Sequence, residues 1–361
     1  MSSQQLVIES EKGQHDPTQS GVPGLDSALQ QKSLINQRLP NELLIHIFKF
    51  HGNTQVLIRV CTRWRDLGIA EPRLWTFIAV DADRVALISH DESPEMQTLA
   101  RQGLKAALER SRDLPLDIKF SNIPRARLGA GQGIGALSFS ILFEYHYRWR
   151  SVELELTVRD AGVSQVLDSV PGYPHFPMLE SLELDISPWK GVSRGVEKRS
   201  ESRVIVSSEI MTRTTTYYLT KFQRSPVLTT LRLPIAPPIW FTIIPGSYPG
   251  IRRLTVERCT PRLLIPWLQK SQESLIWCTV KKFYSGDDVQ KRPPFPLVGH
   301  LTLSELVYLK LPRGFNELIN YVVLPKLKRL VLVDDSGLPV DRSRVPKMVS
   351  RSKCKLSDES E

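Results

Sequence analysis

The sequence is poor in cysteine and contains no long apolar run. Its 361 residues include four scattered cysteines, Cys61, Cys259, Cys278 and Cys354, with no CxxC spacing. Neither a disulfide framework nor a zinc cluster is therefore expected, and this cysteine usage fits a reducing compartment, the cytoplasm or the nucleus. No run approaches 18 consecutive apolar residues, and the polar N-terminus lacks a basic and apolar signal segment, so no membrane association is expected.

Motifs for catalysis, metals and cofactors are missing as well. The seven histidines show no HExxH or paired ligand spacing. Gly129 to Gly135 reads Gly-Ala-Gly-Gln-Gly-Ile-Gly, which lacks the order of a dinucleotide loop and is not followed by Lys-Ser/Thr. We interpret it as a flexible loop before a helix around residues 134–147. The sequence predicts no catalytic residue, no metal and no cofactor, so we expect a protein that is not an enzyme.

The composition supports a folded core of considerable size. Apolar residues make up 41% and charged residues 24% of the chain, which excludes a wholly disordered protein. The length predicts one large folded unit or two unequal ones.

The positive charge is unevenly distributed. The net charge is +10. Residues 188–226 carry eight Lys or Arg against three acids, and residues 336–361 carry six against four. These stretches have weak apolar periodicity, so we predict a solvated basic insertion near 188–224 and a flexible tail over 336–361. The remainder shows no basic face, which disfavours nucleic acid as a partner and leaves binding through the insertion as the open alternative.

A leucine pattern recurs from residue 149 onward. The form Leu-x-x-Leu-x-Leu, or a weaker version of it, starts at positions 149, 179, 228, 251, 275, 306 and 327. Most intervals lie in or near the range of about 20–29 residues that is typical of leucine-rich repeats. The interval of 49 residues contains the basic insertion.

One repeat shows a complete strand and helix cycle. Residues 251–257 alternate as a strand, Thr260 is placed to cap the next helix, and Pro261 suits its first position. Such cycles predict a degenerate, irregular leucine-rich-repeat-like solenoid of short parallel strands and helices over residues 81–335. An ordinary α/β domain whose strands happen to match the pattern is the alternative.

Residues 38–75 form a compact patterned segment with two helical stripes. Leu43, Leu44, Ile47 and Phe48 follow Pro40, which suits a helix start. A unit of about 40 residues buries too little surface to be stable alone, so some apolar side chains should stay exposed unless a partner covers them.

This segment resembles the F-box. The family pattern is found at Leu39, Pro40, Glu42, Leu43, Leu44, Ile47, Phe48, Val60, Cys61, Trp64, Arg65, Leu67, Pro72, Leu74 and Trp75. The connector over residues 49–59 is two or three residues shorter than in the family, which predicts a short middle helix. The whole chain loosely resembles fungal F-box proteins with degenerate leucine-rich repeats. An α+β or α/β chain is thus expected, with a small helical F-box followed by the repeat domain.

The resemblance implies a substrate receptor of an SCF-type (cullin–RING) ubiquitin ligase. Its partners would be a Skp-type adaptor, the cullin ligase core and an unknown target protein. The implied adaptor-facing or supporting residues are Leu39, Pro40, Ile47, Val60, Cys61, Trp64, Leu74 and Trp75. The alternative is a protein-binding repeat scaffold that is not linked to ubiquitination. The expected division is a disordered segment at 1–35, the F-box at 36–80, the repeat domain at 81–335 and the tail.

Overall fold

A computed structural model provides the structure of the chain. It describes residues 39–51, 54–82, 94–122, 131–158, 160–169, 174–187, 208–235, 250–283, 300–312, 315, 318–333 and 343–357. The expected disordered segment at 1–35 lies outside these residues, as does the first half of the expected basic insertion (188–207).

The described chain begins with a small helical unit. Its elements are α2 (Asn41–His51), α3 (Thr54–Leu57), α4 (Thr62–Ala70) and the 3-10 helix η1 (Pro72–Trp75). The middle helix α3 has four residues, in agreement with the short connector in the sequence. Strand β1 follows η1 after one residue, so the helical unit leads directly into the sheet.

Nine parallel strands form one large sheet. Its order is β1-β2-β3-β4-β5-β6-β7-β9-β11, so neighbouring strands follow one another along the chain. The strands are β1 (Phe77–Asp81), β2 (Leu116–Ser121), β3 (Trp149–Thr157), β4 (Ser181–Ser187), β5 (Thr230–Ile235), β6 (Arg253–Cys259), β7 (Trp277–Phe283), β9 (Tyr308–Pro312) and β11 (Arg329–Val333). Two short strands, β8 (Leu301–Thr302) and β10 (Val322–Val323), pair separately.

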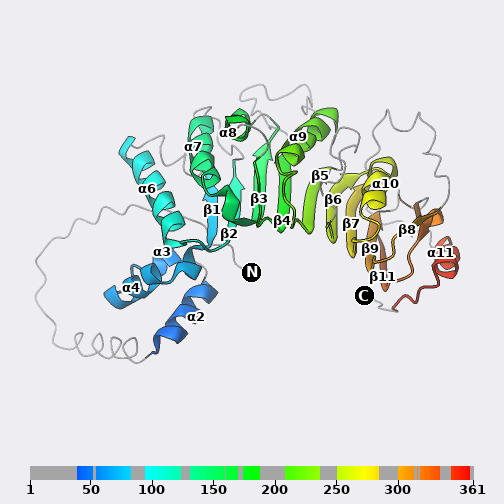
Figure 1. Cartoon of the computed structure of the whole chain (residues 1–361), viewed down its shortest axis with the longest axis horizontal. Helices are drawn as coiled ribbons and strands as arrows, with labels where there is room; N and C mark the ends of the chain where they lie inside the picture. The colour runs from blue at the N-terminus through cyan, green and yellow to red at the C-terminus, as the bar shows by residue number, and fades with distance from the viewer. Residues whose placement is uncertain are drawn as a thin grey trace, which may run out of the picture.

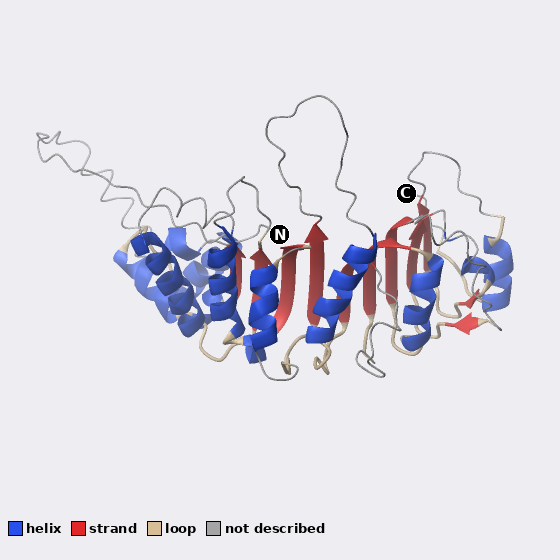
Figure 2. Cartoon of the chain, turned by 90° about the horizontal axis from the view of Figure 1, so that it is seen from above, coloured by secondary structure: helices blue, strands red, loops and turns tan. Residues whose placement is uncertain are grey.

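Helices connect the strands and lie on one side of the sheet. Figure 1 shows them above the strands, and Figure 2, turned by 90°, shows them in front of the strands. The connecting elements are α6 (Pro94–Arg110), α7 (Gly131–Phe143), η2 (His146–Arg148), α8 (Ala161–Ser169), α9 (Ser208–Lys221), α10 (Pro261–Lys270) and η5 (Leu318–Asn320). We call the side of the sheet away from α6 to α10 the open face.

The alternation of leucines places one continuous core between the sheet and the helices. Partners in register across the sheet form a row of apolar residues: Ile78, Ile118, Val152, Leu182, Leu231, Leu254, Cys278, Leu309 and Leu330. Apart from Leu330 on the edge strand, these side chains are at most 2% exposed. Each strand of the sheet thus contributes one side chain to the row, and the next residue of each strand faces the open side.

Every predicted repeat start lies within one or two residues of a strand of this sheet. The Thr260 prediction is also confirmed, because its hydroxyl accepts a hydrogen bond from the Leu263 N–H (3.3 Å) and Pro261 opens α10. The structure therefore shows a mixed α/β chain with a large parallel sheet, preceded by a helical unit.

Three expectations differ from the structure. The basic stretch near 188–224 is not a solvated insertion throughout, because its second half forms α9, in which Tyr218 and Leu219 are buried. The tail is not wholly flexible, since α11 (Val345–Ser352) buries Met348. The glycine-rich loop is shorter than predicted, because α7 begins at Gly131. In α9 and α11 a few buried apolar residues stabilise a segment whose polar composition suggested a loop.

Candidate functional site

The helical unit is built around a small apolar cluster. Leu44 and Phe48 on α2 are fully buried against Leu57, and the ring of Phe48 packs on Trp64 at 5.1 Å between centroids. Positions four apart in a helix share a face, so the stripe from Leu44 to Phe48 points inward as a unit.

The start of α2 is tied to α4 by one arginine. The Arg63 guanidinium donates to the Leu39 carbonyl oxygen and to Asn41 Oδ1, both at 2.6 Å. The Leu44 N–H donates to the Pro40 carbonyl oxygen at 3.2 Å, which closes the first turn of α2. These contacts place Leu39 and Pro40 beside the N-terminal end of α4.

The end of α4 is completed by Trp75. Pro72 has no N–H, so the Gly68 carbonyl lacks the donor that would continue the helix. The Trp75 indole N–H takes that place and donates to the Gly68 oxygen at 2.7 Å. The Arg110 guanidinium of α6 lies 4.7 Å from the Trp75 ring centroid, and Ala107 belongs to the same cluster. Trp75 therefore joins the helical unit to the first helix beside the sheet.

Large apolar side chains also point away from this cluster. Six side chains between residues 43 and 69 are substantially exposed: Leu43 (49%), Ile47 (41%), Phe50 (90%), Val56 (49%), Val60 (51%) and Ile69 (39%). We call these six residues the apolar patch. A domain that stays monomeric seldom concentrates so much apolar surface in so few residues, so the patch is a candidate docking surface.

The predicted adaptor residues fall into three environments. Pro40, Ile47 and Val60 are exposed, whereas Leu74 and Trp75 are buried at 4% and serve the internal cluster. Leu39, Cys61 and Trp64 are half-buried between the two, with Cys61 at the N-cap of α4. Of the eight predicted positions, the structure therefore places three on the surface and two inside.

Four patch residues were missed by the sequence reasoning. Leu43 belonged to the predicted helical stripe but was not chosen as a site residue, and Phe50, Val56 and Ile69 are the others. The i, i+4, i+7 spacing of Leu43, Ile47 and Phe50 on α2 is the signal that could have identified three patch residues together.

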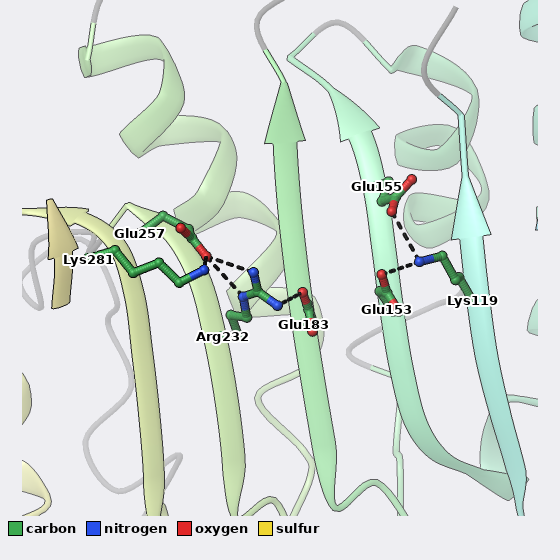
Figure 3. A network of polar contacts seen from close by, with 7 residues as sticks. All are labelled: Lys119, Glu153, Glu155, Glu183, Arg232, Glu257 and Lys281. Carbon is green, nitrogen blue, oxygen red and sulfur yellow. Dashed lines mark hydrogen bonds and ion pairs between the residues drawn. The ribbon is translucent and has the colours of Figure 1, made fainter. Parts of the chain in front are cut away.

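The open face of the sheet carries a second set of polar side chains. Figure 3 shows Lys119 between Glu153 and Glu155, and Arg232 between Glu183 and Glu257. Lys119 Nζ lies 2.5 Å from Glu153 Oε1, and the Arg232 guanidinium contacts Glu183 at 2.5 Å and Glu257 at 2.8 Å. Ion pairs thus link β2 to β3, β4 to β5 and β5 to β6 across this face.

Burial and neighbouring charges shift the pKa of several carboxyl groups on the open face. Burial raises the pKa of Glu183 although Arg232 opposes it. Burial and the carboxylates of Glu155 and Glu257 raise the pKa of Asp185. Burial also disfavours ionised Glu257, but hydrogen bonds from Lys281 and Arg232 hold its pKa below the usual value. Burial therefore opposes ionisation of Glu183 and Asp185, whereas two cations stabilise ionised Glu257.

The described residues show no sign of a metal site or a membrane span. No group of three or more potential metal ligands comes together in the described ranges. No helix in the same ranges is long and apolar enough to cross a bilayer.

Comparison with known proteins identifies the helical unit. Neither curated proteins nor solved structures gave a match to the chain. A family model described as F-box-like matches residues 36–81, which almost coincides with the predicted boundaries. This match contains all eight predicted adaptor positions and the apolar patch, and it supports an F-box protein.

Proposed function

We propose that this protein is the substrate-recognition subunit of an SCF-type (cullin–RING) ubiquitin ligase. The F-box-like unit binds a Skp-type adaptor, and the sheet, which we propose is a degenerate leucine-rich-repeat solenoid of the fungal F-box type, binds a target protein. The observation that carries the proposal is the apolar patch on the unit that matches the F-box-like family.

The physical role of such a subunit is tethering. The chain itself performs no bond chemistry in this proposal. It holds a target near the charged ubiquitin-conjugating enzyme and so raises the local concentration of the target's lysines. A stable connection between the adaptor-binding unit and the sheet serves this role, and the contacts of Trp75 with Arg110 and Ala107 support it.

Exposure divides the predicted adaptor residues into three groups. Pro40, Ile47 and Val60 are exposed and would contact the adaptor directly. Leu43 and Phe50, which are exposed on the same helix as Ile47, would join them. Leu74 and Trp75 would act indirectly by stabilising the unit. Leu39, Cys61 and Trp64 line the boundary between the surface and the cluster.

Co-purification with a Skp-type adaptor tests the proposal. Ile47→Asp with Val60→Asp places two charges on the patch without disturbing the buried cluster, and we expect it to abolish a one-to-one complex. Met178→Asp with Val227→Asp is the matched control, since these apolar side chains are similarly exposed (39% and 42%) but lie in the sheet region.

The control variant should bind the adaptor like the unchanged protein. Equal binding by both double variants would remove the patch from the interface. Absence of any complex with the unchanged chain would favour the alternative, a repeat scaffold that is not linked to ubiquitination.

A further inference from the structure

Four large side chains form a row across the C-terminal half of the open face. Arg253, Trp277, Tyr308 and Arg329 are partners in register on β6, β7, β9 and β11. The Trp277 and Tyr308 rings stack with centroids 3.6 Å apart and planes at 8°. The Arg329 guanidinium lies 5.9 Å from the Tyr308 centroid. We call these four residues the aromatic–arginine row.

The row is accessible and is not explained by the core. Trp277 remains 39% exposed, whereas the side chains of Cys278 and Leu309 on the other side of the same strands are buried. The Trp277 indole N–H donates to Thr279 Oγ1 at 3.1 Å, so the ring is held at the surface in a defined position. Tryptophan, tyrosine and arginine are the residue types that dominate binding energy at protein interfaces.

The surroundings of the row are positively charged. The residues of β5 to β11 that face this side include five cations: Arg232, Arg253, Lys281, Lys310 and Arg329. Glu257 is the acid among them, and it is already bound by Arg232 and Lys281. In the described part of the chain, Arg253 and Lys310 form no ion pair.

The other end of the same face has the opposite charge. Strands β2 to β4 present Asp117, Glu153, Glu155, Glu183 and Asp185 there. Lys119 and Arg150 offset part of this charge, through Glu153 and Asp117 respectively. An acidic ligand is therefore repelled at β2 to β4 and attracted at β6 to β11.

We propose that the aromatic–arginine row docks an acidic peptide segment of the target protein. The inference rests on the proposed function and deepens it, because it gives the chemistry of the target. Carboxylates of the segment pair with Arg253 and Lys310, and an apolar side chain packs on the exposed edge of the Trp277–Tyr308 stack. Four strands span about 14 Å, which matches four or five residues of an extended peptide.

The surroundings of the Tyr308 ring favour a peptide over a stacked nucleic-acid base at this ring. A base needs a free aromatic face on which to stack. Trp277 covers one side of Tyr308 from β7, and Arg329 approaches from β11 on the opposite side. The Arg253 guanidinium, which forms no ion pair among the described residues, can bind a carboxylate through paired hydrogen bonds.

Selection from a random library of twelve-residue peptides tests this proposal on the full chain in complex with its adaptor. We expect the enriched peptides to be net acidic. We expect the double variant Arg253→Glu with Arg329→Glu to lower their affinity at least tenfold. Lys105→Glu with Lys347→Glu is the matched control, since it changes the net charge equally at exposed positions on α6 and α11, and it should lower affinity less than twofold.

The variant Trp277→Ala with Tyr308→Ala provides a second test at unchanged charge, with an expected loss of at least fivefold. Several results would overturn the proposal: no enrichment, enrichment without an acidic bias, equal losses in the row and control variants, or tighter binding of a single-stranded oligonucleotide of matched charge. Adaptor binding by every variant is measured in parallel. Its loss would argue against the proposed function, whereas a failure confined to the peptides would argue against the row.

Discussion

The helical unit and the sheet handle their apolar residues in opposite ways. In the sheet, the leucines of successive strands are buried in continuous rows, and outside the aromatic–arginine row the open face carries mostly polar side chains. In the helical unit, Leu44 and Phe48 are buried while Leu43, Ile47 and Phe50 on the same helix point outward. Each added strand and helix of the sheet buries the apolar side chains of its neighbours, but a unit of a few short helices encloses only a small apolar cluster. The surplus apolar surface is therefore the candidate site for docking another protein.

The largest expected effect comes from the core of the sheet. Leu231→Ala removes a fully buried side chain in the central strand β5 and should lower the free energy of unfolding by about 3–5 kcal/mol, through lost burial and the remaining cavity. Urea denaturation followed by circular dichroism measures this change.

The control for that variant lies in the helical unit. Phe50 is larger but 90% exposed, so Phe50→Ala should change the unfolding free energy by no more than about 0.5 kcal/mol. A comparable loss in both variants would contradict the contrast between the two regions.

A smaller effect is expected at the junction between the regions. Trp75→Phe keeps most of the ring but removes the indole donor, so the Gly68 carbonyl is left without a partner, at a cost of about 1–3 kcal/mol. Limited proteolysis and thermal unfolding of the adaptor-free chain would detect this loss. An unchanged melting temperature would mean that the hydrogen bond does not stabilise the junction.

At the start of α10, one of the helices that cover the sheet, a change in the free energy of unfolding of about 1 kcal/mol is expected. Thr260→Ala removes the hydroxyl that accepts the Leu263 N–H at the start of α10. Thr260→Ser retains that acceptor and should behave like the unchanged chain in the same urea titration. Equal stability of the Ala and Ser variants would show that the cap does not matter.

The smallest effect concerns the open face and depends on pH. The pKa of Asp185 is raised in the folded state, so its ionised form opposes folding at neutral pH. Asp185→Asn should raise stability near pH 7 by less than about 1 kcal/mol, because the partly buried carboxyl keeps substantial contact with solvent, which screens the neighbouring charges.

This gain should vanish as the pH falls well below 3.8, the ordinary pKa of the group, where the carboxyl is neutral in both states. Urea titrations of the variant and the unchanged chain, near pH 7 and in acid, test whether the stability gain appears and disappears as expected. Asp117→Asn is the comparison, since Asp117 is paired with Arg150 and its loss should not stabilise the fold.

Much of the sheet could be predicted from the sequence because the leucine pattern of each strand shows which of its residues face the core. The Leu-x-x-Leu-x-Leu form fixes which side chains are buried, and strands that repeat at short intervals with helices between them must run parallel. The helices α9 and α11 were missed, since they bury only a few residues, such as Tyr218 and Met348, within polar and basic stretches.

The docking surfaces were harder to predict for a different reason. Helical periodicity shows that Leu43 and Leu44 belong to stripes, but it does not tell which stripe faces inward. The family resemblance selected Leu74 and Trp75 along with Pro40 and Ile47, although the first two are buried. The aromatic–arginine row depends on residues separated by 21 to 31 positions, so it becomes visible only when the strands are placed in register.

The direct passage from η1 into β1 sets the reach of the molecule. Each strand adds about 4.8 Å along the sheet, so β9 lies roughly 34 Å from β1. Because Trp75 packs against Arg110, the helical unit is joined to the sheet by a packed junction and not by a linker of variable length. In the proposed ligase, gain or loss of a single strand and its helix would move a target bound beyond it by one fixed step and would change which of the target's lysines come within range.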